Sequence, residues 1–193
     1  MIQKSLILLK PDAVARGLSG EIISRIERTG LKVVAAKLIK SELAKGRTHY
    51  QKDDEWKFKV GERAIQECQD FNLDILEVFG TNSPIEIGNL VVERNAEFLN
   101  SGAVFAMVFQ GPNAVKKIRN LIGSTFPESA NPGTIRGDFG LENSFTGTKR
   151  KRTTYNLIHA SGSVEEAEEE IKIWFNENEI VEYRQVHEDL YGY

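Results

Sequence analysis

Short apolar runs alternate along the chain with segments whose apolar residues recur every three or four positions. The short runs lie at 6–9 (LILL), 31–39 (LKVVAAKLI), 103–109 (AVFAMVF) and 153–159 (TTYNLIH), and each predicts a β-strand. The run at 103–109 carries no charged residue on either face. We therefore expect it to be a central strand, covered on both sides.

Three further segments, 18–29, 113–122 and 163–174, have the apolar period of an amphipathic helix. Asn113 is a plausible N-cap of the second helix. Ser163 begins an S-x-x-E motif, which predicts a capping box at the start of the third. The elements follow the order strand, helix, strand, a long interval, strand, helix, strand, helix.

This order predicts an α+β fold, a ferredoxin-like split βαβ sandwich whose four-stranded antiparallel sheet carries helices on one face. Two intervals exceed a minimal version of that fold. The first runs from 51 to 100 and contains two helical patterns around a turn, so we expect an inserted helical segment. The second is polar and covers about 141–152. We interpret 1–193 as one domain with insertions at about 51–90 and 141–152.

Composition narrows the class of protein. The 193 residues are 40% hydrophobic and 27% charged, and the net charge is −3, so no overall field attracts nucleic acid or anionic lipid. Cys68 has no second cysteine to pair with, which fits a reducing compartment. The apolar run at 6–9 is too short for a signal peptide or a membrane span. We expect a cytoplasmic protein that does not bind membranes.

One histidine stands where chemistry is possible. His159 ends the predicted fourth strand, and Glu170 follows a little over two helical turns later. A carboxylate bound to one imidazole nitrogen fixes the tautomer and leaves the other nitrogen able to attack. A histidine taken alone is more often structural or exposed, so the interpretation depends on its neighbours.

Several basic residues stand at or near the ends of predicted elements. Lys10 ends the first strand, Arg119 lies on the second helix with Thr125 just beyond it, and Arg136 lies between glycines in the loop NPGTIRGDFG. Arginine grips phosphate oxygens through a planar fork, and lysine acts as a compact charge. Each alone is typical of a solvated surface, but together they could converge on one phosphate-binding cleft.

The chain resembles the nucleoside diphosphate kinase family. The matching segments are SLILLKPDAVARGLSGEII, HY at 49–50, SGAVFAMVFQGPNAVKKIRNLIGSTFPESANPGTIRGDFG and NLIHASGSVEEAEEEIKIWF, in the family's order and over about two thirds of the chain. The resemblance implies the ferredoxin-like fold, a homo-oligomer and Mg²⁺-dependent transfer of a terminal phosphate between nucleoside tri- and diphosphates. It implies a ping-pong mechanism through a phosphohistidine.

The resemblance also implies roles for individual residues. His159 matches the histidine that accepts the phosphate, Glu170 the carboxylate that orients it, and Ser161 a neighbouring hydrogen-bonding group. No protein ligand to the metal is expected, because the nucleotide carries Mg²⁺ on its phosphates. The residues that match the nucleotide- and phosphate-binding positions are Lys10, Tyr50, Arg119, Thr125, Arg136 and Asn156.

Three features depart from the family pattern. Gly162 stands where an aspartate is usual, which should weaken capping of the following helix by about 0.5–2 kcal/mol unless Ser163 offsets it. The residue that stacks on the base stays open between Phe58, Trp56 and Val91. The basic run KRKR at 149–152 is either a solvated turn or an added grip on phosphates or on a neighbouring subunit.

Two other hypotheses compete with an active kinase. The insertions and the missing aspartate would suit a nucleotide-binding regulatory or scaffold protein with weak or no kinase activity. Binding of nucleic acid through 149–152 is a third hypothesis, but the negative net charge argues against it as a main role.

Overall fold

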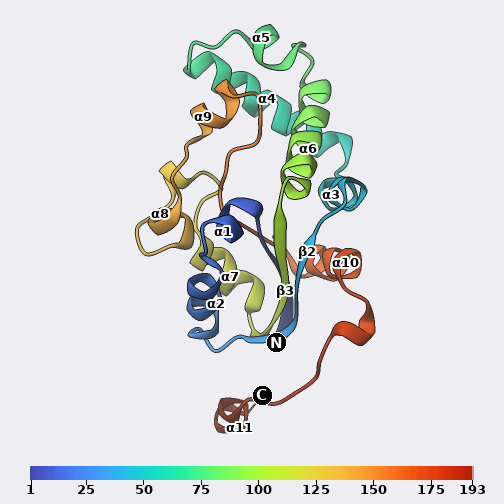
Figure 1. Cartoon of the computed structure of the whole chain (residues 1–193), viewed down its shortest axis with the longest axis vertical. Coiled ribbons are helices and arrows are strands. Elements are labelled where there is room, and N and C mark those ends of the chain that lie inside the picture. Colours follow the sequence, from blue (N-terminus) through green and yellow to red (C-terminus); the bar gives the residue numbers. More distant parts are fainter. Residues whose placement is uncertain (193) are drawn as a thin grey trace.

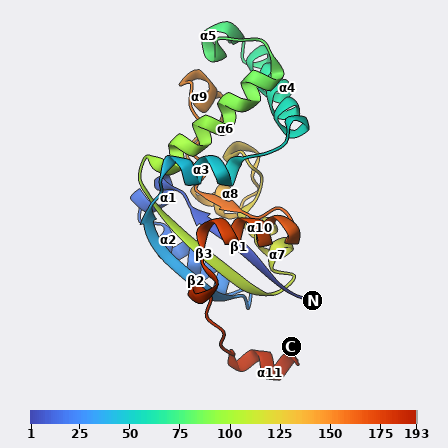
Figure 2. The ribbon, with the colours of Figure 1, turned by 90° about the vertical axis from the view of Figure 1, so that its right-hand side faces the viewer.

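The protein is built on a four-stranded antiparallel sheet with the strand order β2-β3-β1-β4 (Figures 1 and 2). The computed structural model describes residues 1–192. The strands are β1 (Ile2–Leu9), β2 (Lys32–Lys40), β3 (Ala103–Pro112) and β4 (Ile158–Ala160). The predicted central position of the third strand is confirmed, and so is the ferredoxin-like α+β class.

The fourth strand is much shorter than the expected 153–159. Leu157 has a φ of 70°, in the left-handed region that a β-ladder does not use. Its backbone N–H donates to Asp12 Oδ2 at 3.0 Å, and its carbonyl accepts from the N–H of Lys10 at 2.9 Å. These bonds take the place of a ladder partner, so regular pairing with β1 begins only at Ile158.

Helices cover both faces of the sheet, so the expectation of helices on one face was wrong. Side chains alternate along β1: Ile7 and Leu9 join one buried cluster, while Leu6 and Leu8 join another on the opposite face. Trp174 closes the second cluster. The first face carries α1 (Pro11–Ala15), α2 (Ser19–Glu27) and α7 (Ala114–Ile122), and the second carries α3 (Leu43–Tyr50) and α10 (Val164–Trp174).

The predicted helix caps differ in their outcome. Asn113 precedes α7, but its φ is 53° and its side chain makes no capping bond, because an N-cap needs an extended backbone. Ser163 does cap α10, with its Oγ accepting from the N–H of Glu166 at 3.1 Å. The reciprocal half of the box is shifted by one residue, since the Glu166 carboxylate accepts from the N–H of Gly162 at 2.6 Å.

The inserted segment forms a helical unit at one end of the molecule (Figure 1). Two long helices, α4 (Asp54–Asp70) and α6 (Pro84–Asn100), are joined through the short α5 (Ile75–Phe79), where we expected only a turn. The two long helices pack closely around a small core of their own. From the second insertion, α9 (Ser144–Lys149) joins this unit through an edge-to-face contact of Phe145 with Phe71.

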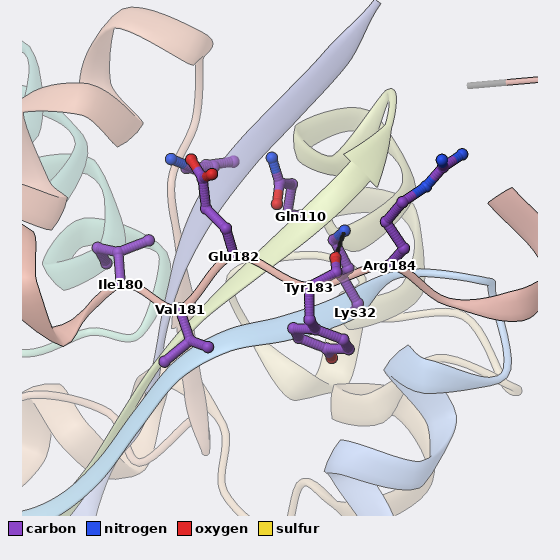
Figure 3. A pocket seen from close by; sticks show the side chains of 8 residues that line it. Lys32, Gln110, Ile180, Val181, Glu182, Tyr183 and Arg184 are labelled. Atoms are coloured by element: carbon purple, nitrogen blue, oxygen red, sulfur yellow. Dashed lines mark hydrogen bonds between the residues drawn. The ribbon is translucent and has the colours of Figure 1, made fainter.

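The C-terminal segment returns along the edge of the sheet. After η2 (Glu177–Glu179) the backbone N–H of Val181 donates to Val34 O at 2.7 Å, before α11 (Val186–Tyr191). A shallow hollow of about 320 Å³ lies between residues 180–184 and the strands, around Lys32 (Figure 3). Within the described residues, no helix combines the length and the apolar character needed to cross a membrane.

Candidate active site

A cavity of about 480 Å³ brings the sequence-predicted binding residues together. One wall belongs to the sandwich: the end of β1, the start of β4, α7 and the loop through η1 (Pro127–Ser129) and α8 (Ile135–Phe139). The other wall belongs to α4, α6 and residues 148–154. The expected site residues that line it are Lys10, Tyr50, Arg119, Thr125, Arg136, Asn156 and His159.

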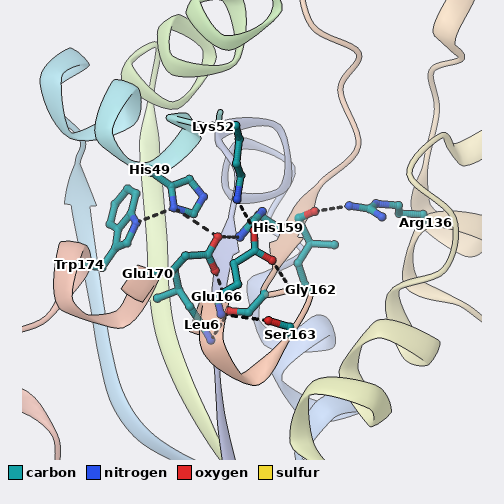
Figure 4. A network of polar contacts seen from close by, with 12 residues as sticks. Leu6, His49, Lys52, Arg136, His159, Gly162, Ser163, Glu166, Glu170 and Trp174 are labelled. Atoms are coloured by element: carbon teal, nitrogen blue, oxygen red, sulfur yellow. Dashed lines mark hydrogen bonds and ion pairs between the residues drawn. The ribbon is translucent and has the colours of Figure 1, made fainter. Parts of the chain in front are cut away.

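A chain of hydrogen bonds holds His159 from behind (Figure 4). Its Nε2 lies 2.8 Å from Glu170 Oε1, and Ser161 Oγ donates to Glu170 Oε2 at 2.7 Å. The Ser161 oxygen accepts in turn from the backbone N–H of Leu6 in β1 at 3.1 Å. Glu170 binds the Nε2 nitrogen of His159. The other ring nitrogen, Nδ1, has no hydrogen-bond partner among the described residues.

Burial keeps this histidine neutral. Burial, with the positive charge of Lys10 as the next cause, lowers the pKa of His159 to about 3. Its side chain is 18% exposed, at the cavity. Burial also raises the pKa of Glu170. At neutral pH the imidazole therefore has a lone pair on one nitrogen, and the hydrogen bond to Glu170 places the ring proton on Nε2.

The sequence predicts no role for His49, yet the structure places it beside His159. It is buried, and its ring contacts that of His159 edge-on, with centroids 4.4 Å apart. Trp174 Nε1 donates to His49 Nδ1 at 3.3 Å, and Glu170 Oε1 lies 3.7 Å from the same nitrogen. Burial holds the pKa of His49 well below its usual value. The one signal in the sequence was its place beside Tyr50.

Lys10 and Asn156 form a pair at the cavity floor. Lys10 Nζ donates to Asn156 Oδ1 at 2.8 Å, and Asn156 Nδ2 donates to the carbonyl of Thr125 at 2.8 Å. Both side chains are buried. Burial, followed by the charge of Arg136, lowers the pKa of Lys10 to about 8. The pair joins the end of β1 to the loop that precedes β4.

The two arginines differ in how they are held. Arg136 is only 4% exposed, and its guanidinium donates to four backbone carbonyls, of Asn156 (3.0 Å), Ile158 (2.5 Å), Gly123 (3.2 Å) and Ser124 (3.0 Å). Of its five N–H groups, four are thus used within the protein. The Arg119 side chain is exposed, and its guanidinium makes no hydrogen bond or ion pair with a described residue. Arg136 therefore braces the loops of the cavity, whereas Arg119 is able to move.

Gly162, where the sequence predicts weaker capping of α10, has a carboxylate beside it. A Cβ at Gly162 would lie 2.6 Å from Glu166 Oε2, so the Glu166 carboxylate occupies the space beside the glycine. Lys52 forms an ion pair with the same carboxylate. Burial alone would raise the pKa of Glu166. The bonds from Lys52 and from the backbone N–H of Gly162 outweigh burial, so the pKa is lowered. A carboxylate from the first turn of α10 therefore binds the backbone at the helix start.

Two of the three candidates for base stacking line the cavity. Trp56 and Val91 face it from α4 and α6, whereas Phe58 is 42% exposed and is not part of the lining. In the basic run, only Arg152 lines the cavity, and Glu142 holds its guanidinium at 2.5 and 2.7 Å. The other three basic residues of 149–152 are exposed.

The fold and the cavity define a class of protein: an α+β enzyme with a neutral histidine beside a group of lysine and arginine side chains, an arrangement typical of phosphotransferases. The family model described as nucleoside diphosphate kinase matches residues 3–62 and 88–180. The chain therefore belongs to the nucleoside diphosphate kinase family of nucleotide-binding phosphotransferases.

Similar proteins support this assignment along nearly the whole chain. A nucleoside diphosphate kinase of Pyrobaculum aerophilum is 41% identical over 181 residues, which cover 94% of this chain and 99% of that protein. A crystal structure of an NDP kinase from the same organism superimposes with a TM-score of 0.91, at 40% identity, over 94% of this chain and 100% of the other. A nucleoside-diphosphate kinase of Borrelia burgdorferi, with bound vanadate and ADP as a transition state mimic, gives a TM-score of 0.77 at 35% identity, over 97% and 95% of the two chains.

Proposed function

We propose that this enzyme transfers the terminal phosphate of a nucleoside triphosphate to a nucleoside diphosphate by a ping-pong reaction, with Nδ1 of His159 as the phosphate acceptor. The supporting observation is the pairing of Nε2 with Glu170, which leaves Nδ1 as the nitrogen able to attack. The neutral state of the ring supports the same conclusion, because a protonated imidazole has no lone pair to attack with.

In the first half-reaction, Nδ1 bonds to the terminal phosphorus and the bond from that phosphorus to the bridging oxygen breaks. The nucleoside diphosphate leaves with the electron pair of that bond. Phosphorylation at Nδ1 leaves the imidazole ring with a positive charge. The Glu170 carboxylate stabilises this charge by accepting a hydrogen bond from Nε2–H. The second half-reaction reverses these steps with a different nucleoside diphosphate.

The cations of the cavity have separate tasks. Arg119 and Thr125 are exposed at the cavity and would bind the phosphates, while Arg136 adds its charge and keeps the surrounding loops in place. The pair Lys10–Asn156 would contact the sugar hydroxyl and the nearest phosphate. Positioning and charge stabilisation of this kind account for most of the rate in phosphoryl transfer. In the Borrelia relative, ADP and vanadate are bound together.

Mg²⁺ would be carried by the nucleotide and would neutralise charge on its phosphates. His49, His159 and Glu170 place ligand atoms within 4.8 Å of one another, but they do not suit this ion. Mg²⁺ requires near-octahedral oxygen ligands, and the Glu170 oxygens are already bound by His159 and Ser161. We propose a homo-oligomer as well, by similarity to the family.

Replacement of His159 tests the proposal directly. His159→Asn keeps a polar side chain of similar reach but removes the nucleophile, so transfer from ATP to a diphosphate should fall to background. His187→Asn is a suitable control, because His187 bonds to Gly30 O and does not line the cavity. A His159→Asn enzyme with the rate of the His187→Asn control would contradict the phosphohistidine mechanism.

A further inference from the structure

Lys52 lies in the short link that joins the sandwich to the inserted helices. This link, residues 51–53, connects the last residue of α3, Tyr50, to the first turn of α4. Tyr50 lines the cavity from one side of the link, and Trp56 lines it from the other. The position of the link therefore decides where these two side chains stand relative to His159.

The Glu166 carboxylate connects this link with the turn that follows the histidine (Figure 4). Its Oε1 forms an ion pair with Lys52 Nζ, and its Oε2 accepts from the backbone N–H of Gly162 at 2.6 Å. Gly162 is the third residue after His159, in the turn from β4 to α10. The backbone N–H of Glu166 also donates to Ser163 Oγ at 3.1 Å. Glu166 thus binds the turn through both its side chain and its backbone.

The charges of this pair act on the histidine's surroundings. The Lys52 and Glu166 side chains are 30% and 28% exposed, so water and salt screen their attraction less than at an open surface. Glu166 and Glu170 are one helical turn apart on α10 and share a face. Burial raises the pKa of Glu170, the charge of Glu166 adds to that shift, and the charge of Lys52 opposes it. Lys52 therefore compensates one of two neighbouring carboxylates beside the imidazole.

We propose that Lys52 and Glu166 are positioning residues for phosphoryl transfer: their ion pair fixes the link before α4 against the turn after His159. The inference rests on the proposed phosphorylation of His159. In-line attack needs the reacting atoms about 3–3.5 Å apart, so a loosened turn lowers the rate of transfer. The proposed phosphate contacts of Arg119 and Thr125 belong to α7 and the loop after it, which the pair does not touch. Nucleotide affinity is therefore retained when the pair is broken.

Single-turnover phosphorylation by ATP separates the rate from the affinity. In Lys52→Met and in Glu166→Gln, the maximal rate constant for phosphorylation of His159 should fall about 5- to 20-fold, while the ATP concentration that gives half the maximal rate changes by less than about twofold. The double variant should lose no more than either single variant, because each change breaks the same pair. Lys52→Arg should recover most of the rate. The matched controls Lys116→Met and Glu169→Gln replace exposed residues outside the cavity lining and should equal wild type.

Hydrogen exchange tests the same inference without any phosphoryl transfer. Peptides that cover residues 157–166 and 50–56 should both exchange faster in Lys52→Met than in Lys116→Met. Unchanged exchange in either peptide, a full phosphorylation rate in Lys52→Met, or losses that add in the double variant would overturn the inference while wild-type labelling of His159 still supports the proposed function. Wild-type protein that accepts no phosphate would instead contradict the proposed function itself.

Discussion

At the scale of single residues, the site depends on how each polar group is held as well as on which groups are present. His159, Glu170 and Ser161 are connected in one line, and the line ends on the backbone of β1. The proposed nucleophile is therefore oriented by the sheet itself. The sequence predicted all three residues, but their direction of bonding could not be predicted, because it depends on which ring nitrogen faces α10.

Replacement of Glu170 by glutamine tests this connection. The amide can still accept from Nε2, but it lacks the charge that stabilises the phosphorylated imidazole. We expect kcat to fall by about 10- to 100-fold, the value of one charge-assisted hydrogen bond, with little change in nucleotide affinity. Steady-state kinetics give both quantities. An unchanged kcat would show that the carboxylate has no role beyond packing.

The pKa of Lys10 predicts a pH dependence. A pKa of about 8 means that Lys10 is a cation below pH 8 and loses its charge as the pH rises through that value. We expect kcat/KM to fall above about pH 8, since this quantity reports the free enzyme. A Lys10→Ala variant should have a lower kcat/KM at every pH and should not show the fall above about pH 8. A wild-type profile that stays flat to pH 9 would contradict the assignment.

At the scale of helices and strands, periodicity located most elements. The strands β1 to β3 and the helices α2, α7 and α10 all lie within a few residues of their predicted positions. The errors have physical causes. The fourth strand is short because Leu157 bonds to residues 10–12, and α5 was missed because a five-residue helix has too few positions to show a period.

Close packing of α4 against α6 depends on glycine. A Cβ at Gly61 would overlap the backbone of Pro84, so Gly61→Ala should force the helices apart and destabilise the fold by about 1–3 kcal/mol. Gly20→Ala in α2 is the control: no atom lies within 4 Å of its added Cβ, and alanine should stabilise that helix by about 0.5–1 kcal/mol. Chemical denaturation measures both, and the two changes should have opposite signs.

At the scale of the whole molecule, the cavity joins segments that are distant in sequence. Arg136 bonds to the carbonyls of Gly123, after α7, and of Ile158, in β4. The two inserted segments meet where Phe71, after α4, contacts Phe145 of α9. Sequence patterns placed basic residues at the ends of elements but could not show that they converge. The contact of His49 with His159 could not be predicted from the sequence either, because it joins α3 to β4, which are far apart along the chain.

The lowered pKa values of His49 and His159 predict how folding stability depends on pH. The unfolded chain binds a proton on each histidine near pH 6.5, whereas the folded state resists protonation because both pKa values are lowered. The free energy of unfolding should therefore fall as the pH drops from 7.5 to 5.5, by about 1 kcal/mol for each histidine. His159→Asn should remove about half of that decrease. A constant free energy over this range would mean that neither ring is held neutral.

The most direct measurement of the central claim is covalent labelling followed by a chase. Wild-type protein incubated with ATP labelled on its terminal phosphate should acquire a bond that is labile in acid, and peptide mapping should place it on His159. Added nucleoside diphosphate should remove the label as nucleoside triphosphate. Label that maps to another residue, or that persists on His159→Asn protein, would contradict the account.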